Sequence, residues 1–262
     1  LLCLSLINLK SVREKKNNMK VTIVAEIGSN WEGSIKKAEK LISKCKDADA
    51  NAIKFQMWRA TDLYNTDHPD WDFIKKSELT FKTAKKLKAI CDGYNIEFYC
   101  SAFYPEAVDY LELLNVKRYK IASRTCLLKD PFSKETLKRK ARTKKHIIIS
   151  MGMGGDKKYI KKIFSKNKTT FCYCVSEYPL LFEKINWKNA LQFDGFSDHT
   201  LGVSAPIIYT TLKKYQKAKN IMIEKHIKLK NSNGPDAPSS IDTEEFSKMI
   251  KSIRLIENSK LN

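Results

Sequence analysis

The sequence lacks several features that would set it apart from an ordinary globular domain. None of its apolar runs approaches the roughly 18 residues that a membrane-spanning helix needs. Its seven cysteines are an odd number and none has CxxC spacing, so neither a disulfide framework nor a thiolate zinc site is expected. Histidine is scarce, with four residues in 262. These absences predict a reduced, cytoplasmic protein with no membrane partner.

Acidic residues are few relative to basic ones, 29 against 49, which leaves a formal charge of +20. Such a surplus invites a nucleic-acid interpretation. However, the lysines are spread in pairs along most polar stretches rather than gathered into one stripe, and no helix-turn-helix, RNP or zinc-finger spacing accompanies them. Most are therefore expected on solvent-facing helix surfaces, where they favour encounter with anionic substrates. A nucleic-acid partner is not expected.

The first 18 residues precede the first convincing strand. The chain opens with LLCLSLINL, which has no preceding basic segment and no small-residue cleavage site, so a secretory signal is not expected. Met19 directly precedes the strand-like segment KVTIVAEIG. We therefore expect residues 1–18 to be a leader outside the core, and residues 19–262 to form the folded domain.

Strand-like and helical patterns alternate along this domain. Short apolar runs typical of buried strands recur between amphipathic segments rich in lysine and glutamate. The expected strands lie near 21–27, 52–56, 96–101, 118–122, 146–150, 169–174, 194–197 and 221–225. The expected helices lie near 34–47, 81–93, 104–114, 131–142, 156–165, 203–217 and 242–257. Eight strands with helices between them predict an α/β fold, the closed parallel (β/α)8 TIM barrel.

Two histidines stand at the ends of neighbouring predicted strands. In a parallel barrel the carboxyl ends of all strands share one rim, where active sites are found. A lone histidine is more often a hydrogen-bonded structural residue, but His199 and His226 at adjacent strand ends, with Asp198 and Glu224 close by, favour a shared divalent cation. Two imidazoles without a thiolate leave positions for water and substrate oxygens, which suits Mn²⁺ better than a structural zinc site.

Lysines and hydroxyls at the same rim predict a binding site for an anion. Lys54 and Lys120 end the second and fourth strands, and ammonium groups bind phosphate and carboxylate. Glu26 is a candidate acid/base and Gln56 an amide that can bind hydroxyls. Each serine alone could equally be a turn or cap residue, but hydroxyls recur at Ser101, Ser123, Ser150, Ser176 and Ser197. The pocket is therefore expected to hold a metal, a multiply charged anion and a polyol.

The segments at these strand ends resemble those of the N-acetylneuraminate (sialic acid) synthases and of their relatives that make other nonulosonic acids. They read VAEIGSNWEGS, AIKFQ, FYCSAF, YKIAS, IIISMGM, CVSEYP, GFSDHTLG, IEKHIKL and GPDAPSS, in this order from about Val21 to about Ile256. The resemblance implies a metal-dependent condensation of phosphoenolpyruvate with an open-chain N-acetylated aldose, such as N-acetylmannosamine, with release of phosphate. Mn²⁺ is the implied ion, and Mg²⁺ or Co²⁺ are alternatives.

The resemblance also implies roles for individual residues. Glu26 matches the acid/base residue, and Glu224 matches a partner of the water beside the metal. The metal ligands are His199 and His226. The implied sugar contacts are Gln56, Tyr178 and Asp236. The implied phosphoenolpyruvate contacts are Lys54, Ser101, Lys120, Ser123, Ser150, Ser176 and Ser197.

Departures from the family pattern concern mainly the sugar. Trp31 replaces a histidine of the first loop, and Thr125 stands where the family commonly has a carboxylate that binds sugar hydroxyls. The sequence ends at Asn262, without the small antifreeze-like domain that supplies an arginine to the sugar site in a family dimer. We therefore expect the barrel domain only, acting as a homodimer or with a separate antifreeze-like chain. The alternatives are the same barrel with a different aldose, and a non-catalytic barrel that serves as a partner protein.

Overall fold

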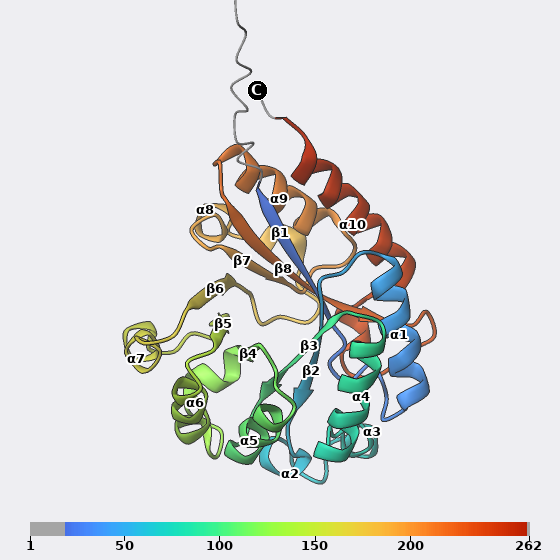
Figure 1. Ribbon diagram of the computed structural model, residues 1–262, viewed down its shortest axis with the longest axis vertical. Coiled ribbons are helices and arrows are strands. Elements are labelled where there is room, and N and C mark those ends of the chain that lie inside the picture. Colours follow the sequence, from blue (N-terminus) through green and yellow to red (C-terminus); the bar gives the residue numbers. More distant parts are fainter. Residues whose placement is uncertain (1–18, 261–262) are drawn as a thin grey trace, which may run out of the picture.

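Eight parallel strands form a closed sheet in the computed structural model, which describes residues 19–260 (Figure 1). The strands follow one another in sequence order, and β1 pairs with both β2 and β8. They are β1 (Lys20–Glu26), β2 (Ala52–Met57), β3 (Glu97–Ala102), β4 (Arg118–Ile121), β5 (His146–Ser150), β6 (Thr169–Tyr173), β7 (Gly195–Asp198) and β8 (Asn220–Lys228). The predicted (β/α)8 barrel is confirmed. The expected leader, residues 1–18, lies outside the described residues.

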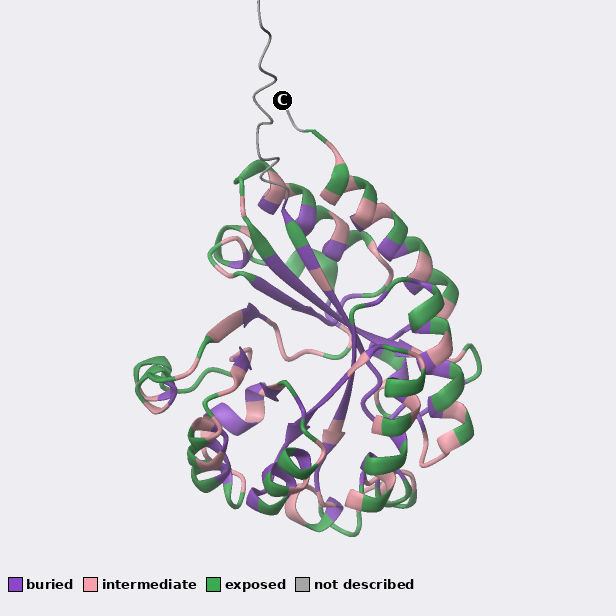
Figure 2. Cartoon of the chain, in the orientation of Figure 1, coloured by how far each residue is buried: buried purple, intermediate pink, exposed green. Residues whose placement is uncertain are grey.

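Helices follow the strands and cover the outside of the sheet. The longer ones are α1 (Ile35–Asp47), α4 (Phe81–Gly93), α5 (Pro105–Leu113), α6 (Ser133–Arg142), α7 (Lys157–Ile163), α9 (Ser204–Tyr215) and α10 (Thr243–Asn258). Shorter elements are α2 (Ala60–Leu63), α3 (Trp71–Lys76), α8 (Trp187–Ala190), β9 (Ile241–Asp242) and the 3-10 helices η1 (Ser123–Leu127), η2 (Phe182–Lys184) and η3 (Ala237–Ser239). Figure 2 shows the strands largely buried and the outer helix surfaces exposed. Among the described helices, none is long and apolar enough to cross a membrane.

Local capping explains where two of the predicted helices begin. Ser34 is the N-cap of α1, and its side chain accepts a hydrogen bond from the backbone N–H of Lys37. Asp242 caps α10 and forms a capping box with Glu245. Each cap satisfies backbone N–H groups that have no partner within the helix. Both predicted helix starts are therefore confirmed.

The interior of the barrel changes from apolar to polar along the strands. Because side chains alternate along a strand, every second residue of each strand faces the inside. One interior layer is an apolar cluster of Val24, Ala52, Tyr99, Ile148, Cys172 and Met222. Two residues further along the same strands stand Glu26, Lys54, Ser101, Ser150, Cys174 and Glu224. The polar layer at the carboxyl ends of the strands therefore packs directly on the apolar layer inside the barrel.

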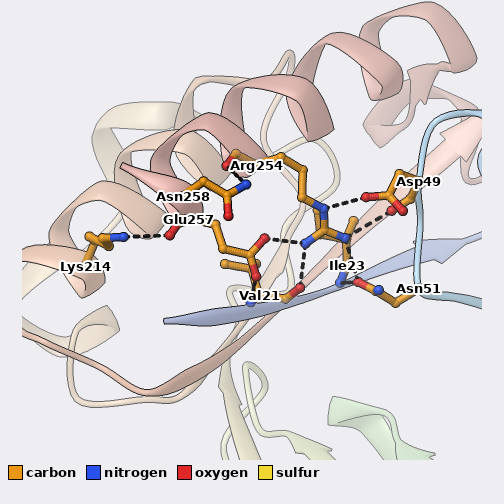
Figure 3. Close-up of polar contacts among 8 residues, drawn as sticks. All are labelled: Val21, Ile23, Asp49, Asn51, Lys214, Arg254, Glu257 and Asn258. Carbon is orange, nitrogen blue, oxygen red and sulfur yellow. Dashed lines mark hydrogen bonds and ion pairs between the residues drawn. The ribbon is translucent and has the colours of Figure 1, made fainter. Parts of the chain in front are cut away.

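Arg254 of α10 joins the last helix to the first strand (Figure 3). Its guanidinium donates hydrogen bonds to the Val21 carbonyl at 2.9 Å and to Asp49 Oδ2 at 2.8 Å. It also donates to Asn51 Oδ1 at 3.0 Å and Glu257 Oε2 at 2.8 Å. Glu257 in turn accepts from the Val21 N–H at 2.8 Å. This network stabilises the closure of the barrel, since β1 is the strand that pairs with β8.

Two lysines of the predicted helices, Lys140 and Lys213, are buried rather than solvent-exposed. Lys213 is only 6% exposed, although most lysines are expected on solvent-facing helix surfaces. Its Nζ donates to the Leu191 carbonyl at 3.3 Å and lies 3.5 Å from Asp194 Oδ1. The long aliphatic stem of lysine allows such burial when the ammonium group finds oxygen partners.

Candidate active site

A narrow cavity lies at the carboxyl ends of the strands. It is lined by Lys54, Gln56, Ser101, Lys120, Ala122, Ser123, Ser150, Cys174, Tyr178, Ser197, His199, Glu224 and His226. All of these except Ala122 and Cys174 are predicted site residues. Ala122 carries no chemical signal, whereas Cys174 follows Cys172 by two residues and strand alternation would have placed it at the rim. Residues far apart in the chain thus meet around this cavity, which we call the mouth of the barrel.

The two lysines at this mouth are paired with buried glutamates. Lys54 forms an ion pair with Glu26. Lys120 Nζ lies 2.6 Å from Glu224 Oε1, and Lys54 Nζ lies 3.4 Å from the same oxygen. All four side chains are buried. The mouth therefore holds two cations and two anions in a region of low dielectric constant, where each charge strongly affects the others.

These charges shift the pKa values of one another. Burial lowers the pKa of Lys54 to about 8, and repulsion from Lys120 adds to this, although Glu224 opposes it. Burial also disfavours the charged form of Lys120, but Glu224 outweighs burial and the pKa of Lys120 is raised. For Glu224, burial is outweighed by Lys120 and Lys54, which hold its pKa well below the ordinary value. Lys120 and Glu224 therefore stay ionised, and Lys54 loses its proton more readily than an ordinary lysine.

Several buried polar atoms near the mouth have no hydrogen-bond partner within residues 19–260. They are Ser101 Oγ, Ser150 Oγ, Ser176 Oγ, Glu224 Oε2 and His226 Nδ1. Buried polar groups in folded proteins are nearly always hydrogen-bonded, so each exception calls for an explanation. Free hydroxyl donors beside two ammonium groups fit an anion with several oxygen acceptors.

The other predicted serines are already engaged. Ser197 Oγ donates to Glu224 Oε1 at 2.9 Å, and Ser123 Oγ accepts from the Gly152 N–H at 2.9 Å. Ser176 does not line the cavity, and its Oγ lies close to Gly152, where an added Cβ atom would stand 2.9 Å from it. Of the predicted hydroxyls, Ser101 and Ser150 are the ones that both line the cavity and lack a partner in the described chain.

The two histidines face one another, with ring centroids 5.5 Å apart. His199 Nδ1 lies 2.7 Å from the Val175 carbonyl oxygen. Since a carbonyl can only accept, Nδ1 carries the hydrogen, and in the neutral ring Nε2 can bind a cation. Burial disfavours the charged ring, but contacts with Cys174 and the Val175 carbonyl outweigh burial and raise the pKa of His199. Burial lowers the pKa of His226 to about 3, which keeps its imidazole in the neutral form that metals bind.

These imidazoles fit a divalent cation whose remaining ligands come from water or substrate. His226 Nδ1 is buried without a partner among the described residues, and an ion would satisfy a nitrogen of this kind. The same part of the chain contains no group of three or more His, Cys, Asp or Glu side chains that could hold a metal. A closed site made by protein ligands alone is therefore not formed there.

Two carboxylates expected beside the histidines bind lysines instead. Asp198 Oδ2 lies 2.6 Å from Lys225 Nζ, and both side chains are completely buried. Glu224 accepts from Lys120, as described above. Neither carboxylate orients an imidazole, and for His199 that contact comes from the Val175 backbone. Side-chain alternation explains the Asp198–Lys225 pair, because both residues face the opposite side of the sheet from the cavity-lining Ser197, His199, Glu224 and His226.

Glu26 and Gln56, the predicted acid/base and hydroxyl-binding amide, are in contact. Gln56 Nε2 donates to Glu26 Oε1 at 3.1 Å, while the other carboxylate oxygen of Glu26 faces Lys54. Gln56 lines the cavity, whereas Glu26 is completely buried beside it. The carboxylate is thus held in place by one amide and one ammonium group.

The predicted sugar contacts Tyr178 and Asp236 occupy different positions. The Tyr178 ring lies over His199 with a centroid separation of 4.1 Å and is 51% exposed, so it forms part of the entrance. Asp236 does not line the cavity, and its Oδ2 accepts from both the N–H and the hydroxyl of Ser29 at 2.7 Å. Gly28 permits this contact: its φ is +52°, and a Cβ atom there would lie 2.4 Å from Asp236 Oδ2.

A closed parallel barrel with ionised residues and unsatisfied hydroxyls at the carboxyl ends of its strands is the architecture of a TIM-barrel enzyme. The profile of the NeuB family matches residues 41–261, and the chain belongs to this family. The family resemblance seen in the sequence is thereby confirmed.

Named relatives of the chain are sugar-acid synthases. It is 31% identical to the N,N'-diacetyllegionaminic acid synthase of Campylobacter jejuni, over 91% of this chain and 77% of that protein. It is 26% identical to the N-acetylneuraminate-9-phosphate synthase of Homo sapiens, over 90% of this chain and 70% of that protein. The crystal structure of the N-acetylneuraminic acid (sialic acid) synthetase of Leptospira borgpetersenii in complex with citrate superimposes with a TM-score of 0.79 at 26% identity, covering 94% of this chain and 88% of that one.

Proposed function

We propose that this enzyme condenses phosphoenolpyruvate with an N-acetylated aldose, forming a nonulosonic acid and inorganic phosphate. The observation that carries the proposal is the grouping of Lys54 and Lys120 with the unpartnered hydroxyls of Ser101 and Ser150 in one cavity. Phosphoenolpyruvate carries a phosphate and a carboxylate, and such a set of charged and neutral donors can bind both. The products named for the relatives support the sugar-acid class.

We further propose that His199 and His226 hold a divalent cation, with Mn²⁺ preferred and Mg²⁺ or Co²⁺ as alternatives. The free Nε2 of His199 and the unpartnered Nδ1 of His226 support this assignment. When bound, the ion would act as a Lewis acid toward the aldehyde oxygen of the sugar.

The residues of the chain orient the reactants and move protons. Lys54 and Lys120 hold the anionic groups of phosphoenolpyruvate so that its C3 faces the aldehyde carbon. A carbon–carbon bond forms between these atoms, the aldehyde oxygen takes up a proton, and water adds to C2 with loss of a proton. The C2–O bond to phosphate then breaks as the C2 hydroxyl becomes the ketone, and phosphate leaves with the proton of that hydroxyl. Glu26, held by Lys54 and Gln56, is the proposed proton carrier. Glu224, whose Oε2 is free, is the proposed partner of the attacking water.

A sugar other than N-acetylmannosamine is the second candidate acceptor. Thr125 is buried in η1 and brings no charge to a position where the family resemblance implies a carboxylate. The relatives are named for legionaminic acid, pseudaminic acid and N-acetylneuraminate 9-phosphate, so members of the family differ in product. Loss of one carboxylate changes which hydroxyl pattern the pocket prefers, because an unpaired sugar hydroxyl costs binding energy.

A phosphate-release assay tests the proposal. The chain is incubated with Mn²⁺, phosphoenolpyruvate and a panel of N-acetylated aldoses that includes N-acetylmannosamine, its 6-phosphate and diacetamido sugars. We expect phosphate release that requires both an aldose and the metal. Absence of release across the panel, together with absence of phosphoenolpyruvate binding, would instead favour a non-catalytic barrel that acts as a partner protein.

The cellular location and the oligomeric state of the chain are also proposals. The six cysteines of residues 19–260 are free thiols, which supports a reducing cytoplasmic location. We propose that the chain works as a homodimer. Sedimentation of the active preparation distinguishes a dimer from a monomer.

A further inference from the structure

We propose that Lys140, on the outside of the barrel, is a positioning residue that holds the strand ends carrying Ser101 and Lys120 together. The anion site needs both residues at fixed relative positions. This inference rests on the proposed function for the ligand used in its test, but its structural part can be tested without any ligand.

The contacts of Lys140 bridge two neighbouring strands. Lys140 belongs to α6 and is completely buried. Its Nζ donates to the Ala102 carbonyl, at the end of β3, at 2.8 Å. It also donates to the Lys120 carbonyl, in β4, at 3.0 Å. One ammonium group thus links the backbones of β3 and β4 from outside the barrel.

This bridge lies where the sheet is least supported by its own pairing. The register of β3 and β4 is defined by a single pair, Ser101 opposite Lys120. By contrast, β2 and β3 pair along their whole length, from Ala52 opposite Glu97 to Met57 opposite Ala102. Because the β3–β4 ladder is so short, the contacts of Lys140 contribute a large share of the hydrogen bonds at this seam.

A second side chain of α6 reaches the same strand ends. Thr136 stands four residues before Lys140, on the same face of the helix, and is also completely buried. Its hydroxyl donates to the Phe103 carbonyl at 3.5 Å. The inner face of α6 is therefore attached to the rim by polar contacts to backbone carbonyls as well as by apolar packing.

The hydrogen bonds of Lys140 indicate a role beyond filling space in the core. An apolar side chain of similar volume would pack here without the cost of burying a charge. Burial lowers the pKa of Lys140 to about 7, and among the described residues no carboxylate forms an ion pair with it. Its partners are backbone carbonyls alone. At Lys120 the strand thus has a lysine nitrogen on each side. The Nζ of Lys120 itself lies inside the barrel, 2.6 Å from Glu224, and the Nζ of Lys140 lies outside.

The test compares Lys140→Met with Lys213→Met. Met keeps the length and apolar stem of lysine and removes its donors. Lys213 is a matched control because it is a buried helix lysine that also donates to a backbone carbonyl, near the start of β7 and away from the mouth. Affinity for phosphoenolpyruvate is measured by calorimetry without sugar. We expect Lys140→Met to bind about 10- to 100-fold more weakly, because small displacements of binding groups have effects of this size. Lys213→Met should bind as the wild type does.

Steady-state kinetics and a crystal structure complete the test. In Lys140→Met the KM for phosphoenolpyruvate should rise more than the KM for the aldose, which a general loss of stability would not produce. If Lys140→Met does not fold, Lys140→Gln keeps a neutral donor and should show the same effect at smaller size. Wild-type affinity in the folded variant would overturn the inference.

The ligand-independent readout is the crystal structure of the variant, in which the ends of β3 and β4 should lie further apart. Unchanged strand ends would also overturn the inference. A wild-type protein that binds no phosphoenolpyruvate would count against the proposed function alone, and the crystal structure would then decide the role of Lys140.

Discussion

Lys120 and Glu224 form a buried ion pair across the inside of the barrel, with Nζ 2.6 Å from Oε1. The hydroxyl of Ser197 donates to the same oxygen at 2.9 Å, and Lys54 Nζ lies 3.4 Å away from it. Glu224 therefore connects the two lysines of the proposed anion site and counteracts the effect of burial on both.

Replacing Glu224 with glutamine should shift the pH range in which the anion is bound. Glu224 raises the pKa of Lys54 and of Lys120, so its neutral replacement lets burial lower both values further. Affinity for phosphoenolpyruvate should then be lost at a lower pH than in the wild type, as measured by calorimetry across pH 6 to 9. Glu135→Gln, at an exposed ion pair with Arg139, is the control. Identical pH profiles for wild type and Glu224→Gln would show that Glu224 does not tune these lysines.

The wild-type enzyme should lose phosphoenolpyruvate affinity as the pH rises through about 8. The pKa of Lys54 is lowered to about 8 from its ordinary value of 10.5, chiefly by burial. The charged form, which exists below the pKa, is the one that attracts the anion, so binding is strongest on the acidic side of this value. In Lys54→Arg the decline near pH 8 should disappear, since a guanidinium stays charged. A decline at the same pH in both proteins would assign the titration to another group.

Removing either imidazole should weaken metal binding. His199→Ala and His226→Ala each leave one nitrogen ligand, and we expect Mn²⁺ affinity to fall by more than about tenfold, since even outer-shell partners contribute that much. Metal content and Mn²⁺ titration calorimetry measure the effect independently of turnover. His146→Ala, at the opposite end of the barrel in β5, is the control. Undiminished Mn²⁺ binding in either mouth variant would contradict the proposed ligand set.

Arg254→Met should destabilise the fold without affecting the mouth. The substitution removes the hydrogen bonds to Val21, Asp49, Asn51 and Glu257 shown in Figure 3. We expect the free energy of unfolding to fall by about 2 to 3 kcal/mol, because several charge-assisted hydrogen bonds are lost, of which those to Val21 and Glu257 are part-buried. Denaturant titration measures this.

The control for Arg254 is Arg139→Met. Arg139 pairs with Asp109 and Glu135 at the surface, where ion pairs contribute about 0 to 1 kcal/mol. Equal losses in the two variants would mean that the Arg254 network does not stabilise the closure of the barrel.

The order of strands could be predicted from the sequence because buried parallel strands are short, nearly continuous apolar runs. The predicted strand at 146–150 coincides with β5, and the longest discrepancy is at β8, which continues to Lys228. The extra residues include His226, which lies within the strand rather than after it. The short helices α2, α3 and α8 were not predicted, because fewer than two helical turns give no recognisable periodicity.

The composition of the mouth could be predicted more readily than its pairing. Reading the strand ends placed Lys54, Lys120, His199 and Glu224 at one rim, since a closed parallel barrel leaves no other arrangement. The ion pairs between carboxylates and lysines depend on how far each side chain extends across the barrel. The spacing of residues in the sequence contains no information on these side-chain conformations. The burial of Lys140 was equally inaccessible, because a lysine in a basic helix is ordinarily exposed.

The most direct test of the account is a crystal structure of the enzyme with Mn²⁺ and phosphoenolpyruvate. We expect the cation on the nitrogens of His199 and His226, and the phosphate and carboxylate of the ligand against Lys54, Lys120, Ser101 and Ser150. A cation bound elsewhere, or a ligand that leaves these lysines paired only with their glutamates, would contradict it.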